Sequence, residues 1–268
     1  MAADVLERIL TRTRADVAER RARRSMARMR AQARDRAPAR SLGAALRFEP
    51  GVSIIAECKH RSPSAGVLRD PYDPVALARA YESAGAAAIS CLTDGPHFGG
   101  SLAHLTAVRG AVTLPVLRKD FIVDPYQIFE ARAHDADAIL LIVAALESEH
   151  LQALLAAAQE IGLECLVEVH DCEEFGIAVD AGARIIGVNN RDLRDFSVDI
   201  GRALRVGAER ASLPNASEVA LVAESGVESP EQILRLREAK IDAALVGTAL
   251  VRSSHPRQMA SSLVEAGR

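Results

Sequence analysis

An acid and a base stand two positions apart in the stretch IIAECKHRSPSAG, residues 54–66. The residues before them, Ile54 to Ala56, are of the types that buried strands use. Side chains two positions apart in a strand point to the same face, so Glu57 and Lys59 share one face where this strand ends. A carboxylate beside an ammonium group can hold a charged substrate or exchange protons with it. What lies opposite this pair therefore decides its chemistry.

Further apolar runs end in the same kind of residue: Lys119 in LPVLRKD, Glu168 in LECLVEV, Asn189 in RIIGVNN and Glu224 in VALVAES. Apolar residues stand two positions before three of them, namely Leu117, Leu166 and Val222. Each of these charges thus continues an apolar face. A buried charge without a partner is costly, but two ammonium groups and three carboxylates can compensate one another. A single one of these residues could belong to a salt bridge at the surface. Six of them that converge at the same end of the fold favour an active site.

The elements that must position these residues recur at regular spacing along the chain. Eight short apolar runs begin at residues 52, 87, 114, 137, 163, 184, 219 and 242. Amphipathic stretches separate them, and Gly85, Gly162 and Gly182 follow helical stretches while Pro74 and Pro230 lie near helix starts. Such alternation predicts an α/β fold, a single (β/α)8 TIM barrel whose strand ends meet at one face. A doubly wound sheet is the structural alternative, but it would normally carry G-x-G-x-x-G after the first strand, and none is present.

We expect residues 1–48 to form an N-terminal helical extension packed on the barrel, and residues 49–268 to form the barrel. Residues 1–40 hold twelve Arg against five Asp and Glu, although the whole chain has a net charge of −3. An apolar stripe, made of Val5, Ile9, Leu10 and Val17, favours packing with a solvated Arg face. The alternative is an arm that binds nucleic acid, for which the aromatic platforms and recognised motifs are missing.

The loops after the last two apolar runs, AESGVESPEQ and LVGTALVRSS, each combine a Gly with small hydroxyl residues. Backbone N–H groups at such turns, with the positive end of a following helix, bind phosphate. Gly226 and Gly247 could also be no more than tight-turn residues. Their place after the last two strands of a barrel favours phosphate.

The composition of the chain limits where the protein is expected to work and which groups it is expected to bind. The chain has 268 residues, 49% of them hydrophobic, and it has no run of 18 apolar residues and no apolar signal core at its start. We therefore expect a cytoplasmic protein that binds no membrane. The four cysteines form no C-x-x-C pair and the histidines form no H-E-x-x-H pattern, so no metal site has support from the sequence.

The chain resembles the indole-3-glycerol-phosphate synthase family in segments that run in order from about residue 40 to 253: IIAECKHRSPSAG, LTDGPHFGGSLAHL, LPVLRKDFIVDPYQI, ADAILLIVAAL, LVEVHD, IGVNNRDL, VAESGV and ALVGTALVR. The resemblance implies a barrel enzyme of tryptophan biosynthesis that needs no cofactor or metal. Its reaction converts 1-(2-carboxyphenylamino)-1-deoxyribulose 5-phosphate to indole-3-glycerol phosphate, with release of carbon dioxide and water. The alternative is a paralogous phosphosugar-binding barrel enzyme of a specialised indole pathway.

The resemblance also implies roles for individual residues. It makes Lys119 the general acid that protonates the ribulose carbonyl, Glu168 the general base, and Lys59 a contact of the substrate carboxylate or the acid of the dehydration. It assigns the holding of hydroxyls and lysines to Glu57, Asn189 and Glu224. It builds the phosphate cradle from Ser62, Ser225, Gly226, Gly247 and Thr248, the apolar wall from Phe98, Phe121 and Leu140, and a further loop from Arg191 and Leu193. The expected partner is a phosphorylated small molecule, not nucleic acid, and the expected state is a monomer or weak homo-oligomer.

Overall fold

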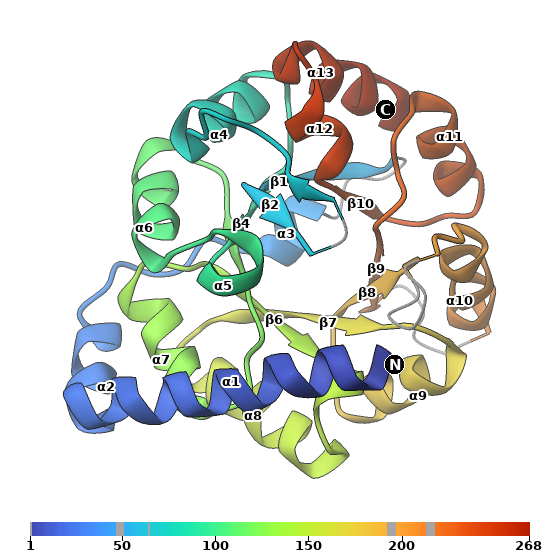
Figure 1. The fold of residues 1–268 in the computed structure, drawn as a ribbon. Coiled ribbons are helices and arrows are strands. Elements are labelled where there is room, and N and C mark those ends of the chain that lie inside the picture. Colours follow the sequence, from blue (N-terminus) through green and yellow to red (C-terminus); the bar gives the residue numbers. More distant parts are fainter. Residues whose placement is uncertain (1, 47–50, 64, 192–196, 213–217) are drawn as a thin grey trace.

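The computed structural model describes residues 2–46, 51–63, 65–191, 197–212 and 218–268. Eight parallel strands lie at its centre: β1 (Ser53–Cys58), β4 (Ala88–Leu92), β5 (Val116–Lys119), β6 (Ala138–Ile142), β7 (Glu164–Val169), β8 (Ile185–Asn189), β9 (Ala220–Glu224) and β10 (Ala243–Val246). They close into a barrel in the order β1-β10-β9-β8-β7-β6-β5-β4, which Figure 1 shows nearly end-on. The predicted (β/α)8 barrel is confirmed, because each apolar run forms one strand of a closed sheet. A doubly wound sheet would have had two open edges.

An outer layer of helices covers the barrel (Figure 1): α4 (Pro74–Ser83), α6 (Leu102–Ala111), α7 (Pro125–Ala133), α8 (Ser148–Glu160), α9 (Cys172–Asp180), α10 (Gly201–Ala211), α11 (Pro230–Glu238) and α13 (Pro256–Gly267). The predicted helix boundaries are confirmed at both kinds of end. Gly85, Gly162 and Gly182 have φ values of 90°, 71° and 88°, the left-handed conformation that ends a helix. Pro74 and Pro230 lie in the first turn of their helices, where no N–H is needed.

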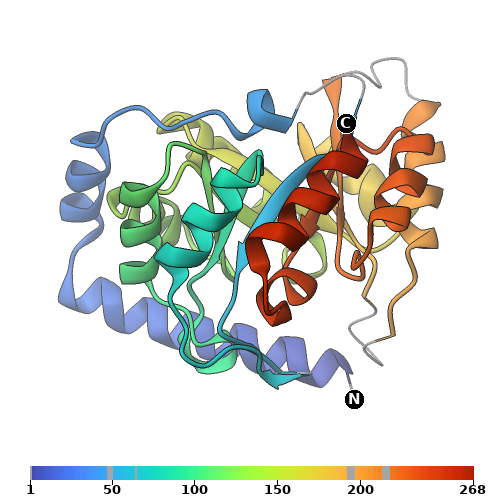
Figure 2. The same cartoon turned by 90° about the horizontal axis from the view of Figure 1, so that it is seen from above.

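Two apolar layers follow from the alternation of side chains along each strand. Ile54 and Ala56 pack outward against the helices, whereas Ile55 and Leu117 belong to the cluster inside the barrel. The helix α3 (Leu42–Leu46) adds two fully buried leucines to that inner cluster. Figure 2 shows α3 and the N-terminal helix at opposite ends of the barrel. The interior is therefore filled from one end, and the polar strand ends occupy the other.

The N-terminal extension consists of α1 (Ala2–Arg23) and α2 (Met26–Arg34) in addition to α3. Its predicted apolar stripe packs as expected, because Ile9, Leu10 and Val17 are buried; the side chain of Val5 lies outside the described residues. The boundary predicted between residues 48 and 49 falls within 47–50, also outside the described residues, and it remains a prediction.

The sequence suggested that the arginines of the extension form a solvated face, but not all of them do so. Several of them form ion pairs with carboxylates of the barrel, among them Arg20–Glu130 at 3.4 Å, Arg21–Asp124 at 2.9 Å and Arg36–Asp135 at 3.0 Å. These partly exposed pairs contribute little stability individually, but they fix where the extension lies.

Short elements lie at the end of the barrel where the strands finish: β2 (Arg61–Ser62), β3 (Gly66–Val67), α5 (Gly95–Phe98), η1 (Val143–Ala145) and α12 (Thr248–Arg252). In Figure 2 the hairpin of β2 and β3, the helix α12 and the N-terminal half of α1 gather at this end. Within the described part of the chain, no helix combines the length and the apolar character that a membrane span requires.

Candidate active site

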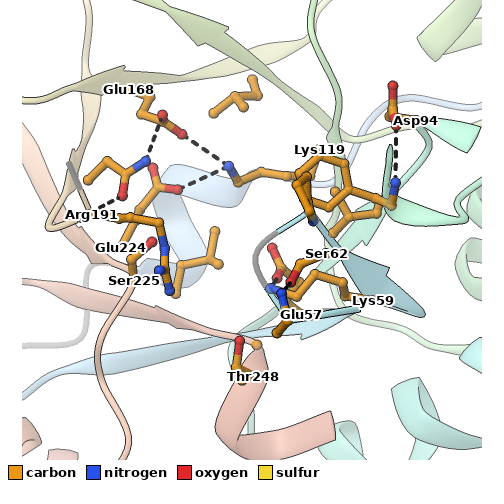
Figure 3. A pocket seen from close by; sticks show the side chains of 18 of the residues that line it. Glu57, Lys59, Ser62, Asp94, Lys119, Glu168, Arg191, Glu224, Ser225 and Thr248 are labelled. Atoms are coloured by element: carbon orange, nitrogen blue, oxygen red, sulfur yellow. Dashed lines mark hydrogen bonds and ion pairs between the residues drawn. The ribbon is translucent and has the colours of Figure 1, made fainter. Parts of the chain in front are cut away.

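A cavity of about 510 Å³ opens at the carboxyl ends of the barrel strands. Figure 3 shows charged side chains from several strands pointing into it. Every predicted site residue that the structure describes lines this cavity: Glu57, Lys59, Ser62, Phe98, Lys119, Phe121, Leu140, Glu168, Asn189, Arg191, Glu224, Ser225, Gly226, Gly247 and Thr248. Leu193 lies outside the described residues. The alternation of side chains along each strand therefore predicted correctly that the strand-end residues face this cavity.

Lys119 occupies the centre of the charged cluster. Its Nζ donates a hydrogen bond to Glu168 Oε2 at 3.0 Å and lies 3.3 Å from Glu224 Oε2. The amide of Asn189 donates to the other oxygen of Glu168 at 3.0 Å. The strand register explains the meeting, because Asn189 and Glu224 are paired neighbours on β8 and β9. One ammonium group is thus held between two carboxylates, and one of these is fixed from both sides.

Glu57 and Lys59, at the end of β1, form a second charged unit. Lys59 Nζ lies 2.7 Å from Glu57 Oε1, and the Glu57 side chain is buried. Gly247 leaves the space for it, since a β carbon at this position would clash with Glu57 Oε1. Gly187 on β8 does the same for Glu224. These glycines are needed because a buried carboxylate approaches the backbone, and not only because the chain turns.

Burial and mutual charge set the protonation of the central cluster. Burial alone would lower the pKa of Lys119, but Glu168 and Glu224 raise it well above its ordinary value. Burial alone would raise the pKa of Glu168, but Lys119 and then His170 lower it. For Glu224, burial prevails over the attraction of Lys119 and raises the pKa to about 7. Lys119 is therefore charged before a substrate arrives, Glu168 is an anion, and Glu224 changes charge near neutral pH.

The protonation of Glu224 has a measurable consequence for stability. Its pKa of about 7 in the folded protein exceeds its ordinary value of 4.5, so the folded state binds the extra proton between these values. The stability from protonated Glu224 is present at low pH and is lost as pH rises through about 7. Glu224→Gln cannot ionise. The melting temperature of this variant should therefore rise relative to the wild type between about pH 4.5 and about pH 7, and the difference should then stay level. A difference that stays constant across that range would contradict the assignment.

Apolar side chains form one wall of the cavity. The rings of Phe98 and Phe121 lie 6.4 Å apart between centroids, within the range of aromatic contact. Leu6 and Ile9 of α1 also line the cavity, so the extension covers part of the mouth. This wall suits a flat aromatic group held beside the charged cluster.

The two Gly-containing loops meet on another side of the cavity, and of the two only the second leads directly into a helix, as the sequence suggested for both. The helix after β9 begins only at Pro230, whereas α12, a helix of five residues, begins at Thr248 with Gly247 as its N-cap, and both of these residues line the cavity. Ser225 and Gly226 instead adopt φ values of 64° and 76°. Two successive left-handed residues form a sharp turn directly after β9, at the wall of the cavity. The turn at Ser225 and Gly226 and the amino end of α12 are what could hold a phosphate.

Comparison with solved structures supports the fold. A structure entitled "Native KDPGal structure" aligns with a TM-score of 0.58 and 21% identity, over 80% of this chain and 93% of the other. At this level of identity, the likeness concerns the fold alone. The family model described as indole-3-glycerol phosphate synthase matches residues 6–263, which is nearly the whole chain. The chain belongs to the indole-3-glycerol phosphate synthase family.

Individual members of the family align with this chain over nearly their whole length. The indole-3-glycerol phosphate synthase 1 of Streptomyces coelicolor is 49% identical over 263 residues, which are 98% of this chain and 96% of the relative. The indole-3-glycerol phosphate synthase of Mycobacterium avium is 50% identical over 265 residues, 99% of this chain and 95% of the relative. The resemblance found in the motifs is therefore confirmed across the chain. The family's reaction is a decarboxylating ring closure in tryptophan biosynthesis, so the chain is a lyase.

The site also contains residues that the sequence reasoning missed. Asp94, Asp120 and Arg252 line the cavity, and Leu6 and Ile9 reach it from α1. Asp94 follows β4 by two positions and Asp120 follows β5 directly, so extending the search past each strand end would have found them. No local pattern in the sequence shows that α1 crosses the mouth, because that contact joins residues far apart in the chain.

Proposed function

We propose that this cavity converts 1-(2-carboxyphenylamino)-1-deoxyribulose 5-phosphate to indole-3-glycerol phosphate, with Lys119 as the general acid and Glu168 as the general base. The observation that supports this division most strongly is the position of Lys119 Nζ, 3.0 Å from Glu168 and 3.3 Å from Glu224. A charged acid and an ionised base lie side by side in one cavity. Ring closure followed by dehydration requires one of each.

Ring closure joins the aromatic carbon that carries the carboxylate to the ribulose carbonyl. The carbonyl is a poor electrophile until its oxygen receives a proton, and an ammonium group can supply it. The pKa of Lys119 lies above its ordinary value, so the group is protonated when the substrate binds. As the bond forms, the carbonyl oxygen becomes alkoxide-like and strongly basic. The proton transfer from Lys119 then becomes favourable in the transition state, where it accelerates the reaction.

Dehydration follows the loss of carbon dioxide. The hydroxyl left by the ring closure must leave as water, and a proton must be removed from the new five-membered ring. Glu168 suits the removal, because its pKa is below its ordinary value and Asn189 fixes the orientation of its carboxylate. Lys119 lies within a hydrogen bond of Glu168, so the proton that the base gains can return to the acid.

Lys59 and Glu57 face the other side of the substrate. The Lys59 side chain is partly buried beside Glu57, and its ammonium group can bind the carboxylate of the anthranilate ring. Phe98, Phe121 and Leu140 hold the ring itself, so that the carbon to be attacked is presented to the carbonyl. Arg191 donates its backbone N–H to Asn189 Oδ1 at 3.0 Å and steadies the loop after β8.

The phosphate of the substrate fits the loops that contain Ser225, Gly226, Gly247 and Thr248, with Ser62 opposite. Inorganic phosphate at tens of millimolar should therefore compete with the substrate and raise KM without changing kcat. It should also raise the melting temperature by mass action, because it binds only the folded state. Chloride at equal ionic strength is the control. If phosphate acts no differently from chloride, the proposed phosphate site in these loops is wrong.

The function itself is tested by incubating the protein with the carboxyphenylamino-deoxyribulose phosphate and following indole fluorescence and carbon dioxide. We expect both to appear in equal amounts. A paralogous enzyme that acts on another phosphosugar would still bind phosphate but would leave this substrate unchanged. The two functions are thus separated by a single assay.

We also propose that the enzyme works in the cytoplasm as a monomer or weak homo-oligomer and binds no nucleic acid. The ion pairs of the extension's arginines with the barrel support the last point, because they engage these side chains within the protein. A gel-shift measurement at low salt tests it, and a salt-dependent shift would contradict it.

A further inference from the structure

His170 lies one residue beyond the end of β7 and two positions after Glu168. Its Nδ1 is 3.0 Å from Glu174 Oε2, and its backbone N–H donates to the same oxygen at 2.7 Å. Its Nε2 lies 3.8 Å from Glu168 Oε1. The imidazole ring therefore stands between the proposed base and a second carboxylate, which belongs to the first turn of α9.

The Nε2 atom of His170 is buried and has no hydrogen-bond partner among the described residues. Buried polar atoms in folded proteins are nearly always paired, so an orphan beside an active site requires an explanation. A small movement of Glu168 would close the 3.8 Å gap to a hydrogen bond. Hydrogen bonds that act in catalysis are often long before the substrate binds.

The charges around this ring favour its protonated form. Burial alone would lower the pKa of His170, but the hydrogen bond to Glu174 and the carboxylates of Glu168 and Glu224 raise it. Glu174 is 21% exposed at its side chain, against 5% for Glu168. The ring thus links a buried carboxylate to one that reaches solvent.

Such a link would serve the reaction because the reaction consumes a proton. A carboxylate leaves as neutral carbon dioxide and a carbonyl oxygen leaves as water, so each turnover takes up one proton more than the substrate supplies. Lys119 gives its proton away at ring closure, and its side chain is only 16% exposed. It must then be recharged before it can protonate the departing hydroxyl.

We propose that His170, held in place by Glu174, forms a proton relay with Glu168 that recharges Lys119. The inference rests on the proposed function and goes beyond it, because His170 acts through Glu168 and is a positioning residue. The Nε2–H bond of the imidazolium breaks as an O–H bond forms on Glu168. This proton lies on Oε1, whereas Lys119 contacts Oε2, so the neutral carboxyl group must release Asn189 and turn before it can donate. The O–H bond then breaks as an N–H bond forms on the neutral amine of Lys119. The neutral ring keeps its Nδ1–H on Glu174 and takes a new proton from water.

His170→Ala tests the relay, with the exposed His150→Ala as the matched control. Water can still recharge the site slowly, so we expect kcat to fall about tenfold, less than for the loss of a direct acid or base, with KM unchanged. Imidazole added to the buffer should restore kcat by filling the space that the side chain leaves. Glu174→Gln should give a smaller loss of the same kind.

The first turnover gives the sharpest signature. Lys119 is already charged in the resting enzyme, so substrate should disappear in that turnover at the wild-type rate in His170→Ala, and only product formation should be slow. A His170→Ala variant with unchanged kcat would overturn the relay. So would a loss of kcat that extends to ring closure and that imidazole does not relieve, which indicates a merely structural role. If instead Glu168→Gln and Lys119→Ala retain activity, the proposed function fails and not the relay alone.

Discussion

Lys119→Ala should lower kcat by at least about 10²-fold, because general acid catalysis contributes about 10²–10⁴-fold and the other lysine that lines the cavity is already paired. Lys59 is engaged with Glu57 at 2.7 Å on another side of the cavity. Steady-state assays by indole fluorescence measure the effect. Binding should change less than turnover, since the proton transfer belongs to the transition state.

Two further variants separate the proton from the shape of the side chain. Lys119→Met keeps the apolar stem and should be as slow as Lys119→Ala. Lys119→Arg keeps the charge but should not restore activity, because the planar guanidinium is too broad for the place between Glu168 and Glu224. Activity above about a tenth of wild type in Lys119→Ala would contradict the role, since a group worth about 10²-fold cannot be lost so cheaply.

Glu168→Gln should also lower kcat by about 10²-fold or more, because the amide keeps the shape of the side chain but cannot accept the proton. Lys119 then keeps only Glu224 as a carboxylate partner, so its pKa should fall toward the ordinary value. Ring closure should therefore survive while dehydration becomes slow. The exposed Glu173→Gln, on the adjoining helix, is the control for the same chemical change and should behave like the wild type. Equal slowing of ring closure and dehydration would argue against Glu168 as the base of the second step.

Much of the fold could be predicted because its signals are local. Each strand is a short apolar run, and Gly85 or Gly162 marks the end of a helix by the conformation it alone adopts easily. Closure of the sheet is not local, but eight strand–helix repeats have few other ways to bury both faces of a parallel sheet. The placement of Glu57 and Glu224 on the inner face then followed from a period of two.

What could not be predicted depends on contacts between distant segments. The leucines of α3 fill the barrel interior, and Ile9 of α1 lines its mouth, yet both segments read only as amphipathic. The need for Gly247 came from Glu57, nearly two hundred residues earlier, and could be seen only once both were placed. His170 is the exception, because the same two-residue spacing that linked Glu57 to Lys59 also links it to Glu168.

A single-turnover experiment tests the division of labour between Lys119 and Glu168 most directly. Excess enzyme is mixed rapidly with the substrate, and substrate, ring-closed intermediate and indole product are followed in the wild type and in both variants. Lys119→Ala should leave the substrate unreacted, whereas Glu168→Gln should consume it and accumulate a ring-closed, undehydrated intermediate. An intermediate that accumulates in Lys119→Ala, with unreacted substrate in Glu168→Gln, would contradict the assignment of acid and base.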